Sequence, residues 1–377
     1  MSLQFITGNS GNGKTKYLFN RIVKEAKANP RDNYLVIVPE QFTMQTQRQL
    51  VDLSENKVIM NIDVLSFKRL AYRVFDELGI TNLTVLEETG KNLVLRKLAA
   101  QEADKLGVIG RNLNRIGYIS EVKSLLSELV QYNISPEELG RYIASGRLSD
   151  TLSDKLKDVL VLYEAFEKFM QDKYITAEEI LNVLCNVAEE SAILRNSVIA
   201  FDEFTGFTPI QNQLIKKLFV ISKKIYVTLT IDCREDIFKS RGMQELFDMP
   251  KRTVKSLTEM AAFYGIEVEE PIILDKNYRL AENEELSFME QQLFRKRRCS
   301  FKKVPKHIHI DCLRDPKQEL TKIARRINEL VRNENLRYRD IAIVTGDVNI
   351  YAGYVREIFD KYNIPYFIDA TQEILFH

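Results

Sequence analysis

The sequence is poor in the residues from which metal centres and disulfide frameworks are built. It contains no tryptophan, only 3 histidines and 4 cysteines, and no two cysteines form a C-x-x-C pair. Structural zinc sites need closely spaced cysteine and histidine ligands, so the sequence predicts neither a zinc finger nor a histidine-based metal centre. Scattered cysteines of this kind are typical of reduced thiols in a cytosolic protein.

Long apolar runs and an excess of charge of one sign are also missing. No stretch of about 18 apolar residues occurs, and the N-terminus lacks the basic start and apolar run of a signal peptide. The sequence therefore predicts a cytoplasmic protein without membrane contact. The 54 lysines and arginines nearly balance the 53 acidic residues, giving a net charge of +1. No overall basic field recruits nucleic acid, so any DNA site must be a local patch.

What is present indicates an ordinary globular protein of the α/β class. Hydrophobic residues make up 45% and charged residues 28% of the sequence, as in ordinary soluble proteins. The length of 377 residues is enough for two or three domains. The segment YLVIV at 34–38 is too apolar to face water on either side, as in a parallel strand that is buried on both faces. We expect further strands at 3–7, 58–64, 197–202 and 224–231, and helices at 14–28, 41–53 and 67–78.

The character of the chain changes twice. Long 3.6-residue periods, such as Leu125, Leu126, Leu129 and Val130, predict an all-helical insertion at residues 87–195. The last part of the chain is expected to form strands at 308–312 and 340–344 around a helix at 316–333. It stops within this βα pattern, which indicates a piece of something longer. The predicted division is 1–86 plus 196–274, then 87–195, then 275–377.

A glycine-rich loop follows the first strand. Residues 8–15 read GNSGNGKT and fit G-x-x-x-x-G-K-[ST], between an expected strand and an expected helix. Glycines let backbone N–H groups surround phosphate oxygens, and the helix N-terminus adds a positive dipole end. Lys14 is expected to reach the β- and γ-phosphates of ATP, and the Thr15 hydroxyl to ligate Mg²⁺. The alternative is a glycine-rich turn that matches by chance. The predicted ATP-binding residues are Gly8, Asn9, Ser10, Gly11, Asn12, Gly13, Lys14 and Thr15.

A phosphate loop of this type works with a second, acidic site. The apolar segment at 198–201 ends in Asp202 and Glu203. Asp202 is expected to hold Mg²⁺ through water, together with Thr15. Glu203 is expected to be catalytic, orienting and polarising the attacking water. The alternative is two acidic residues at an ordinary strand end.

The combination resembles superfamily 1 helicases of the UvrD/Rep type. SFKRLAYR at 66–73 resembles the family's T-F-H-x-L-x-x-R-L segment, which touches single-stranded DNA. LDKNYR at 274–279 resembles L-x-Q-N-Y-R, whose arginine, here Arg279, reaches the γ-phosphate as a catalytic group. The resemblance implies an α/β fold in which a P-loop RecA-like parallel-sheet domain carries an all-helical insertion and is followed by part of a second RecA-like domain. ATP would bind between the two, with Arg279 approaching from the far side. The implied DNA-binding residues are Phe67, Lys68, Arg69 and Arg73.

Finer details resemble the AddB component of AddAB-type helicase–nucleases. VPEQF at 38–42 and DEFTGFTP at 202–209 are similar to segments of that component. The resemblance implies a bacterial, cytoplasmic protein that acts in double-strand break repair by homologous recombination, with an AddA-type helicase–nuclease subunit and single-stranded DNA as partners. The family's nuclease domain and iron–sulphur cluster are expected only in a C-terminal part that this chain lacks.

The chain departs from the motor helicases in two motifs. Thr205 and Gly206 replace the last two residues of D-E-x-Q-D, and Glu235 replaces the glutamine of G-D-x-x-Q, which links nucleotide to DNA. The departures imply a module that scans for the Chi sequence rather than a motor, with weak ATPase activity. Two alternatives stay open: a self-sufficient ATP-driven helicase, and a small-molecule P-loop kinase.

Weaker signals are ambiguous. Seven basic residues lie at 295–306 without an acidic one, and they fit either a DNA backbone or a solvated linker, which we favour. Phe67 fits either base stacking or the core. Phe42 and Phe204 are expected in the core.

Overall fold

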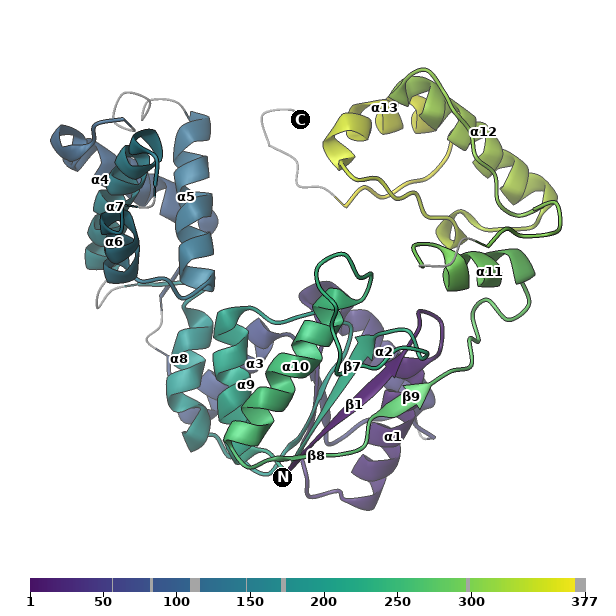
Figure 1. Ribbon diagram of the computed structural model, residues 1–377, viewed down its shortest axis with the longest axis horizontal. Helices are drawn as coiled ribbons and strands as arrows, with labels where there is room; N and C mark the ends of the chain where they lie inside the picture. The colour runs from purple at the N-terminus through teal and green to yellow at the C-terminus, as the bar shows by residue number, and fades with distance from the viewer. Residues whose placement is uncertain are drawn as a thin grey trace. The chain divides into compact units, whose positions relative to one another are not determined.

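The structure, a computed structural model, describes residues 1–55, 57–81, 84–108, 116–146, 148–170, 174–295 and 299–369. The chain forms two compact units, Met1–Asn283 and Glu284–His377 (Figure 1). No helix in the described ranges combines the length and the apolar character needed to cross a membrane.

The first unit is built around a parallel sheet. The strand order is β3-β2-β6-β7-β1-β8, with β9 also paired to β1, and every pairing in it is parallel. All residues of β2 and β6 are buried, which confirms the expectation of strands covered on both faces. The strands are β1 (Ser2–Gly8), β2 (Tyr34–Ile37), β3 (Ile62–Leu65), β6 (Val198–Phe201), β7 (Lys224–Thr230), β8 (Glu267–Val268) and β9 (Ile272–Leu274).

Two groups of helices cover this sheet. One core joins α1 (Lys14–Ala28) and α2 (Thr43–Leu53) to strand residues such as Ile6, Val36 and Tyr226. The other core takes up the alternate strand residues, such as Phe5, Ile37 and Val227. Because successive side chains of a strand point to opposite faces, the two cores lie on the two sides of the sheet. The helices of the second core are α3 (Phe67–Leu78), α8 (Ile180–Val187), α9 (Pro209–Ile221) and α10 (Asp248–Phe263).

The expected helical insertion is present and has a core of its own. That core is formed by apolar residues of its helices, such as Leu95, Leu126 and Leu162. The short strands β4 (Val85–Leu86) and β5 (Ile175–Thr176) pair in parallel where the chain enters and leaves it. The last helix of the predicted insertion, α8, does not join this core. It packs against the sheet, in the same core as α3, α9 and α10. The insertion helices are α4 (Glu88–Gln101), α5 (Ile116–Gln131), α6 (Pro136–Ala144) and α7 (Asp150–Met170).

The second unit differs from expectation. Its helices are α11 (Glu284–Gln292), α12 (Pro316–Asn333) and α13 (Val348–Lys361), and α12 and α13 pack around Leu320 and Phe359. The expected strands at 308–312 and 340–344 are wrong, since residues 284–295 and 299–369 contain no strand. Apolar side chains in both segments, Ile310 and Val344, are more than nine-tenths exposed. A strand exists only through hydrogen bonds to a neighbouring strand, and neither segment is paired with a strand among the described residues.

One strand of the first unit starts several residues later than the sequence predicts. The strand expected at 58–64 begins only at Ile62, the first residue that pairs with β2.

Candidate functional site

The carboxyl ends of the strands bring the predicted site together. Gly8 ends β1 opposite Thr230 of β7, and Phe201 ends β6 opposite Val227. The loops that follow these parallel strands therefore begin at one edge of the sheet, where ligands bind in open α/β sheets.

The glycine-rich loop connects β1 to α1, as predicted. Gly11 has a φ of +89°, in the left-handed region that only glycine adopts without cost. A Cβ atom there would lie 2.8 Å from the Asn277 side-chain oxygen and 2.8 Å from the Arg279 Cβ. At Gly8, a Cβ would lie 2.6 Å from the backbone oxygen of Leu274. The loop therefore needs glycine at both positions for close approach of residues 274–279.

Lys14 turns back over this loop. Its Nζ donates hydrogen bonds to the backbone oxygens of Gly8, at 3.1 Å, and Asn9, at 3.0 Å. Burial lowers the pKa of Lys14, although the carboxylates of Glu203 and Asp202 favour its charged form. A half-buried ammonium group inside a loop of backbone amides is suited to an anion such as phosphate.

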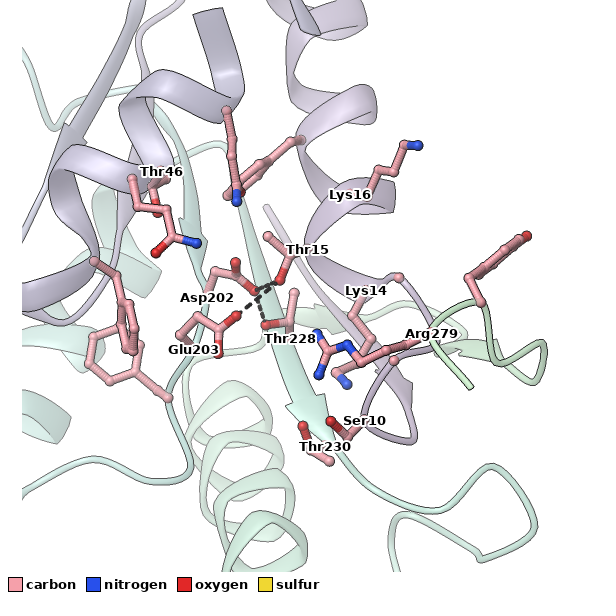
Figure 2. A pocket seen from close by; sticks show the side chains of 18 of the residues that line it. Ser10, Lys14, Thr15, Lys16, Thr46, Asp202, Glu203, Thr228, Thr230 and Arg279 are labelled. Carbon is pink, nitrogen blue, oxygen red and sulfur yellow. Dashed lines mark hydrogen bonds between the residues drawn. The ribbon is translucent and has the colours of Figure 1, made fainter. Parts of the chain in front are cut away.

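Thr15, Asp202, Glu203 and Thr228 converge beside the loop (Figure 2). The Thr15 hydroxyl donates to Asp202 Oδ1 at 3.3 Å and lies 3.3 Å from Glu203 Oε1. The Thr228 hydroxyl also donates to Asp202 Oδ1. Asp202 is 1% exposed, and its Oδ2 has no hydrogen-bond partner among the described residues. Burial raises the pKa of Asp202, because nothing there compensates the desolvated charge fully.

This arrangement fits a hard divalent cation. Hydroxyl and carboxylate oxygens are the ligands that Mg²⁺ prefers, and the Oδ2 of Asp202 is a buried acceptor to which no described residue donates. No group of three or more His, Cys, Asp or Glu side chains within the described ranges is placed to hold a metal alone. Mg²⁺ that binds together with a nucleotide needs only one or two protein carboxylates, since phosphates and water complete its shell.

Glu203 has an unusual backbone. Its φ is +64°, a left-handed conformation that is uncommon for a residue with a side chain. Its side chain is exposed to the cavity described below. Such conformations persist only where the surrounding structure enforces them, and they gather at functional sites.

The segment 274–279 lies against the glycine-rich loop within the first unit. The Asn277 side-chain amide donates to the Ser10 oxygen at 3.0 Å, and the Tyr278 N–H donates to the Gly11 oxygen at 3.0 Å. The Asn12 amide donates to the Leu274 oxygen at 2.6 Å. The expectation that this segment approaches from a second domain is therefore wrong: β9 pairs with β1 and carries it directly to the loop.

A cavity of about 750 Å³ joins these groups. Lys14, Thr15, Asp202, Glu203 and Arg279 all line it, as Figure 2 shows. Among the lining residues that were not predicted from the sequence are Thr228 and Thr230 on β7, Gln45 and Gln49 on α2, and Tyr278. The two threonines alternate along the strand and so share one face. Gln45 and Gln49 are four residues apart on α2. This spacing places both side chains on one face of the helix, so the sequence could have predicted a polar face there.

The four predicted DNA-binding residues separate into two kinds. Phe67 is only 7% exposed and packs in the core, so the structure does not support its stacking on a base. Lys68, Arg69 and Arg73 are exposed on α3. Arg69 pairs with Glu40 at 2.9 Å, and Arg73 Nε lies 3.7 Å from Asp63. A local basic patch is present, but acidic side chains accompany two of its three members.

The structure also describes Phe42, Phe204 and most of the basic segment at 295–306. Phe42 and Phe204 are half-buried against the two cores and also line the cavity. Of the basic segment at 295–306, residues 296–298 lie outside the described residues, and Lys303 pairs with Glu284 at 2.5 Å.

Comparison with known proteins shows the family to which the chain belongs. The chain is 38% identical over 380 residues to the B-type subunit of the ATP-dependent helicase/deoxyribonuclease of Lachnoclostridium phytofermentans, covering 100% of this chain and 33% of the relative. Identity to the proteins of the same name is 34% over 379 residues in Clostridioides difficile, and 33% over 382 residues in Clostridium tetani. These two alignments cover 99% of this chain and 32% and 33% of the relatives. The chain thus spans about a third of the length of the curated relatives it matches. A family profile described as "ADDB, N-terminal" matches residues 5–290, so the chain belongs to the family of AddB N-terminal regions.

Proposed function

We propose that this chain is the nucleotide- and single-stranded-DNA-binding part of a helicase–nuclease subunit that acts in double-strand break repair by homologous recombination. The observation that carries the proposal is the shared cavity, in which Lys14 and Thr15 lie beside Asp202 and Glu203. The names of the relatives, which contain both "helicase" and "deoxyribonuclease", support the wider role.

The residues have separate tasks in binding ATP. The backbone amides of residues 8–15 and the Lys14 ammonium would hold the phosphates, and Thr15 and Asp202 would hold Mg²⁺. Mg²⁺ would neutralise charge on the phosphate oxygens. Glu203 would orient a water molecule and accept its proton, and Arg279 would offer its guanidinium to the γ-phosphate. Figure 2 supports this division, since Arg279 lies next to Lys14 and Glu203 lies next to Thr15.

Single-stranded DNA would be bound through its phosphates by Lys68, Arg69 and Arg73. Exposed ion pairs such as Arg69–Glu40 contribute only about 0–1 kcal/mol, so a phosphate can replace the carboxylate at little cost. Because so few phosphates would be contacted, we expect weak binding without preference among random sequences. The relatives are named as one subunit of an enzyme, which supports a partner, and we propose that this partner is an AddA-type subunit.

We further propose a Chi-scanning module rather than a motor. Thr205 and Glu235 stand where motor helicases of the resembling family carry relay residues. The alternative is a self-sufficient ATP-driven helicase, which the intact set of Lys14, Asp202 and Glu203 favours. Strand-displacement assays with and without an AddA-type partner separate the two: unwinding by this chain alone would establish the motor.

Calorimetry with Mg²⁺ and ATP tests the nucleotide site. Lys14→Ala removes the ammonium group that lies over the loop, and we expect binding to be lost or weakened at least about tenfold, since a charged hydrogen bond contributes about 1.5–3 kcal/mol. Lys24→Ala, on the exposed side of the same helix, is the matched control and should bind as the wild type does. Equal affinity in all three proteins would refute the phosphate-loop assignment.

A further inference from the structure

Four phenylalanine rings form a closed cluster next to Glu203. They are Phe67, Phe201, Phe204 and Phe207, called here the four-ring cluster. All six pairs of rings are in contact, with centroids 5.2 to 6.3 Å apart. Phe201 and Phe67 are buried, whereas Phe204 and Phe207 are half-buried against the same core. Phe204 also lines the cavity that holds Lys14 and Glu203.

Three of the rings come from the chain around Glu203. Phe201 ends β6 two residues before it, Phe204 follows it directly, and Phe207 precedes the capping residue of α9. A left-handed residue such as Glu203 would relax to an ordinary conformation if its neighbours were free to move. The rings on both sides of it fix the direction of the chain before and after the strained residue.

The fourth ring comes from a distant segment. Phe67 is the first residue of α3, and its ring lies 5.8, 5.5 and 6.3 Å from those of Phe201, Phe204 and Phe207. Its own position is set by Ser66, the N-cap of α3, whose oxygen accepts from the Arg69 N–H at 3.3 Å. The Ser66 hydroxyl in turn donates to Glu40, which follows β2.

We propose that Phe67, acting through the four-ring cluster, is a positioning residue that holds the Glu203 carboxylate in its place beside Thr15. This rests on the proposed function, in which Glu203 orients the water that attacks ATP. Phe67 does not line the cavity, so it is not a catalytic residue. The proposed effect is on the geometry of Glu203, where a displacement of about 1 Å is enough to slow a reaction about 100-fold.

The test compares Phe67→Leu with Phe75→Leu. Phe75 lies on the same helix, is 2% exposed and belongs to the same core, but it is not one of the four rings. Single-turnover ATP hydrolysis and Mg²⁺–ATP affinity are measured for both. Phe67→Leu should slow hydrolysis about 10- to 100-fold with an unchanged Kd, whereas Phe75→Leu should leave the rate near that of the wild type. Phe207→Leu, at a half-buried ring, is the second variant and should behave like Phe67→Leu.

A double variant separates positioning from general loss of structure. Glu203→Gln removes the group that is positioned, so adding Phe67→Leu to it should slow hydrolysis no further. Equal rates for Phe67→Leu and Phe75→Leu, or a full additional loss in the Glu203→Gln background, would overturn the proposal. Both outcomes leave the nucleotide site intact. Failure of the wild-type chain to bind Mg²⁺–ATP would overturn this proposal and the proposed function together.

Discussion

Replacing Gly11 by alanine would disturb the contact between the glycine-rich loop and residues 277–279. At a φ of +89°, an added side chain costs about 1–2 kcal/mol. The new Cβ would also lie 2.8 Å from both the Asn277 side-chain oxygen and the Arg279 Cβ. Either the glycine-rich loop or the segment 277–279 must therefore move.

The hydrogen bonds at this contact set the further cost. The Asn277 amide donates to the Ser10 oxygen and the Tyr278 N–H donates to the Gly11 oxygen. Each bond contributes about 0.5–1.5 kcal/mol to stability. If both are lost, Gly11→Ala should lower the free energy of unfolding by about 2–5 kcal/mol in total.

Gly79→Ala provides the matched control for the conformational part. Gly79 has a φ of +68°, and a Cβ there would meet no atom of the described residues within 4 Å. The substitution shares the left-handed strain and the reduced entropy of the unfolded chain, but not the collision. Urea unfolding should therefore show Gly11→Ala to be less stable than Gly79→Ala by about 1–3 kcal/mol. Equal free energies of unfolding would show that residues 277–279 are not held against the loop.

Two further predictions concern charge. Burial raises the pKa of Asp202 above its ordinary value of 3.8, so the folded state keeps this proton to higher pH than the unfolded state and loses stability as pH rises through that window. Asp202→Asn should then melt at a higher temperature than the wild type at pH 7 without Mg²⁺, with a smaller difference near pH 4, and should lose Mg²⁺-dependent ATP binding. A wild type that melts higher at pH 7 would contradict this. Lys68→Ala should reduce the log–log salt slope of single-stranded DNA binding, measured by fluorescence anisotropy, by about 0.7, and an unchanged slope would exclude a phosphate contact.

The convergence of the glycine-rich loop with the acidic pair was predictable from the sequence because its signals are local. Phosphate loops depend on residues within one turn between a strand and a helix, and the Asp202–Glu203 pair ends a visibly apolar strand. Parallel strands place such ends at one edge of a sheet, whatever their separation in sequence. The structure brings Lys14, Thr15, Asp202 and Glu203 together, as these local signals predict.

The predictions that were wrong concern contacts between segments that are distant in the sequence. Nothing local distinguishes a Phe67 that stacks on a base from one that packs against Phe201, and tertiary packing decides between them. The pairing of β9 with β1 is equally non-local, and it moves Arg279 from the expected far side of a cleft to the first unit. The apolar segments at 308–312 and 340–344 have strand-like composition, but composition cannot supply a hydrogen-bonded neighbour.

Two of the residues that depart from the motor helicases, Thr205 and Glu235, lead to a last prediction. The Thr205 oxygen accepts a hydrogen bond from the Thr253 hydroxyl at 3.0 Å, and Glu235 pairs at 2.6 Å with Lys251, whose side chain is 4% exposed. Both residues thus contact side chains of α10. Neither has the glutamine amide that, in the motor helicases, links DNA binding to the bound nucleotide.

We therefore expect slow steady-state phosphate release that single-stranded DNA changes less than about twofold, with binding of ATP retained. Glu203→Gln is the control for turnover by this site, since it should slow whatever release the wild type shows by about 100-fold or more without abolishing it. Turnover of about ten per second or more that rises strongly with DNA would be the rate of a competent enzyme. It would show that Thr205 and Glu235 do not interrupt the relay, and that the chain is a motor.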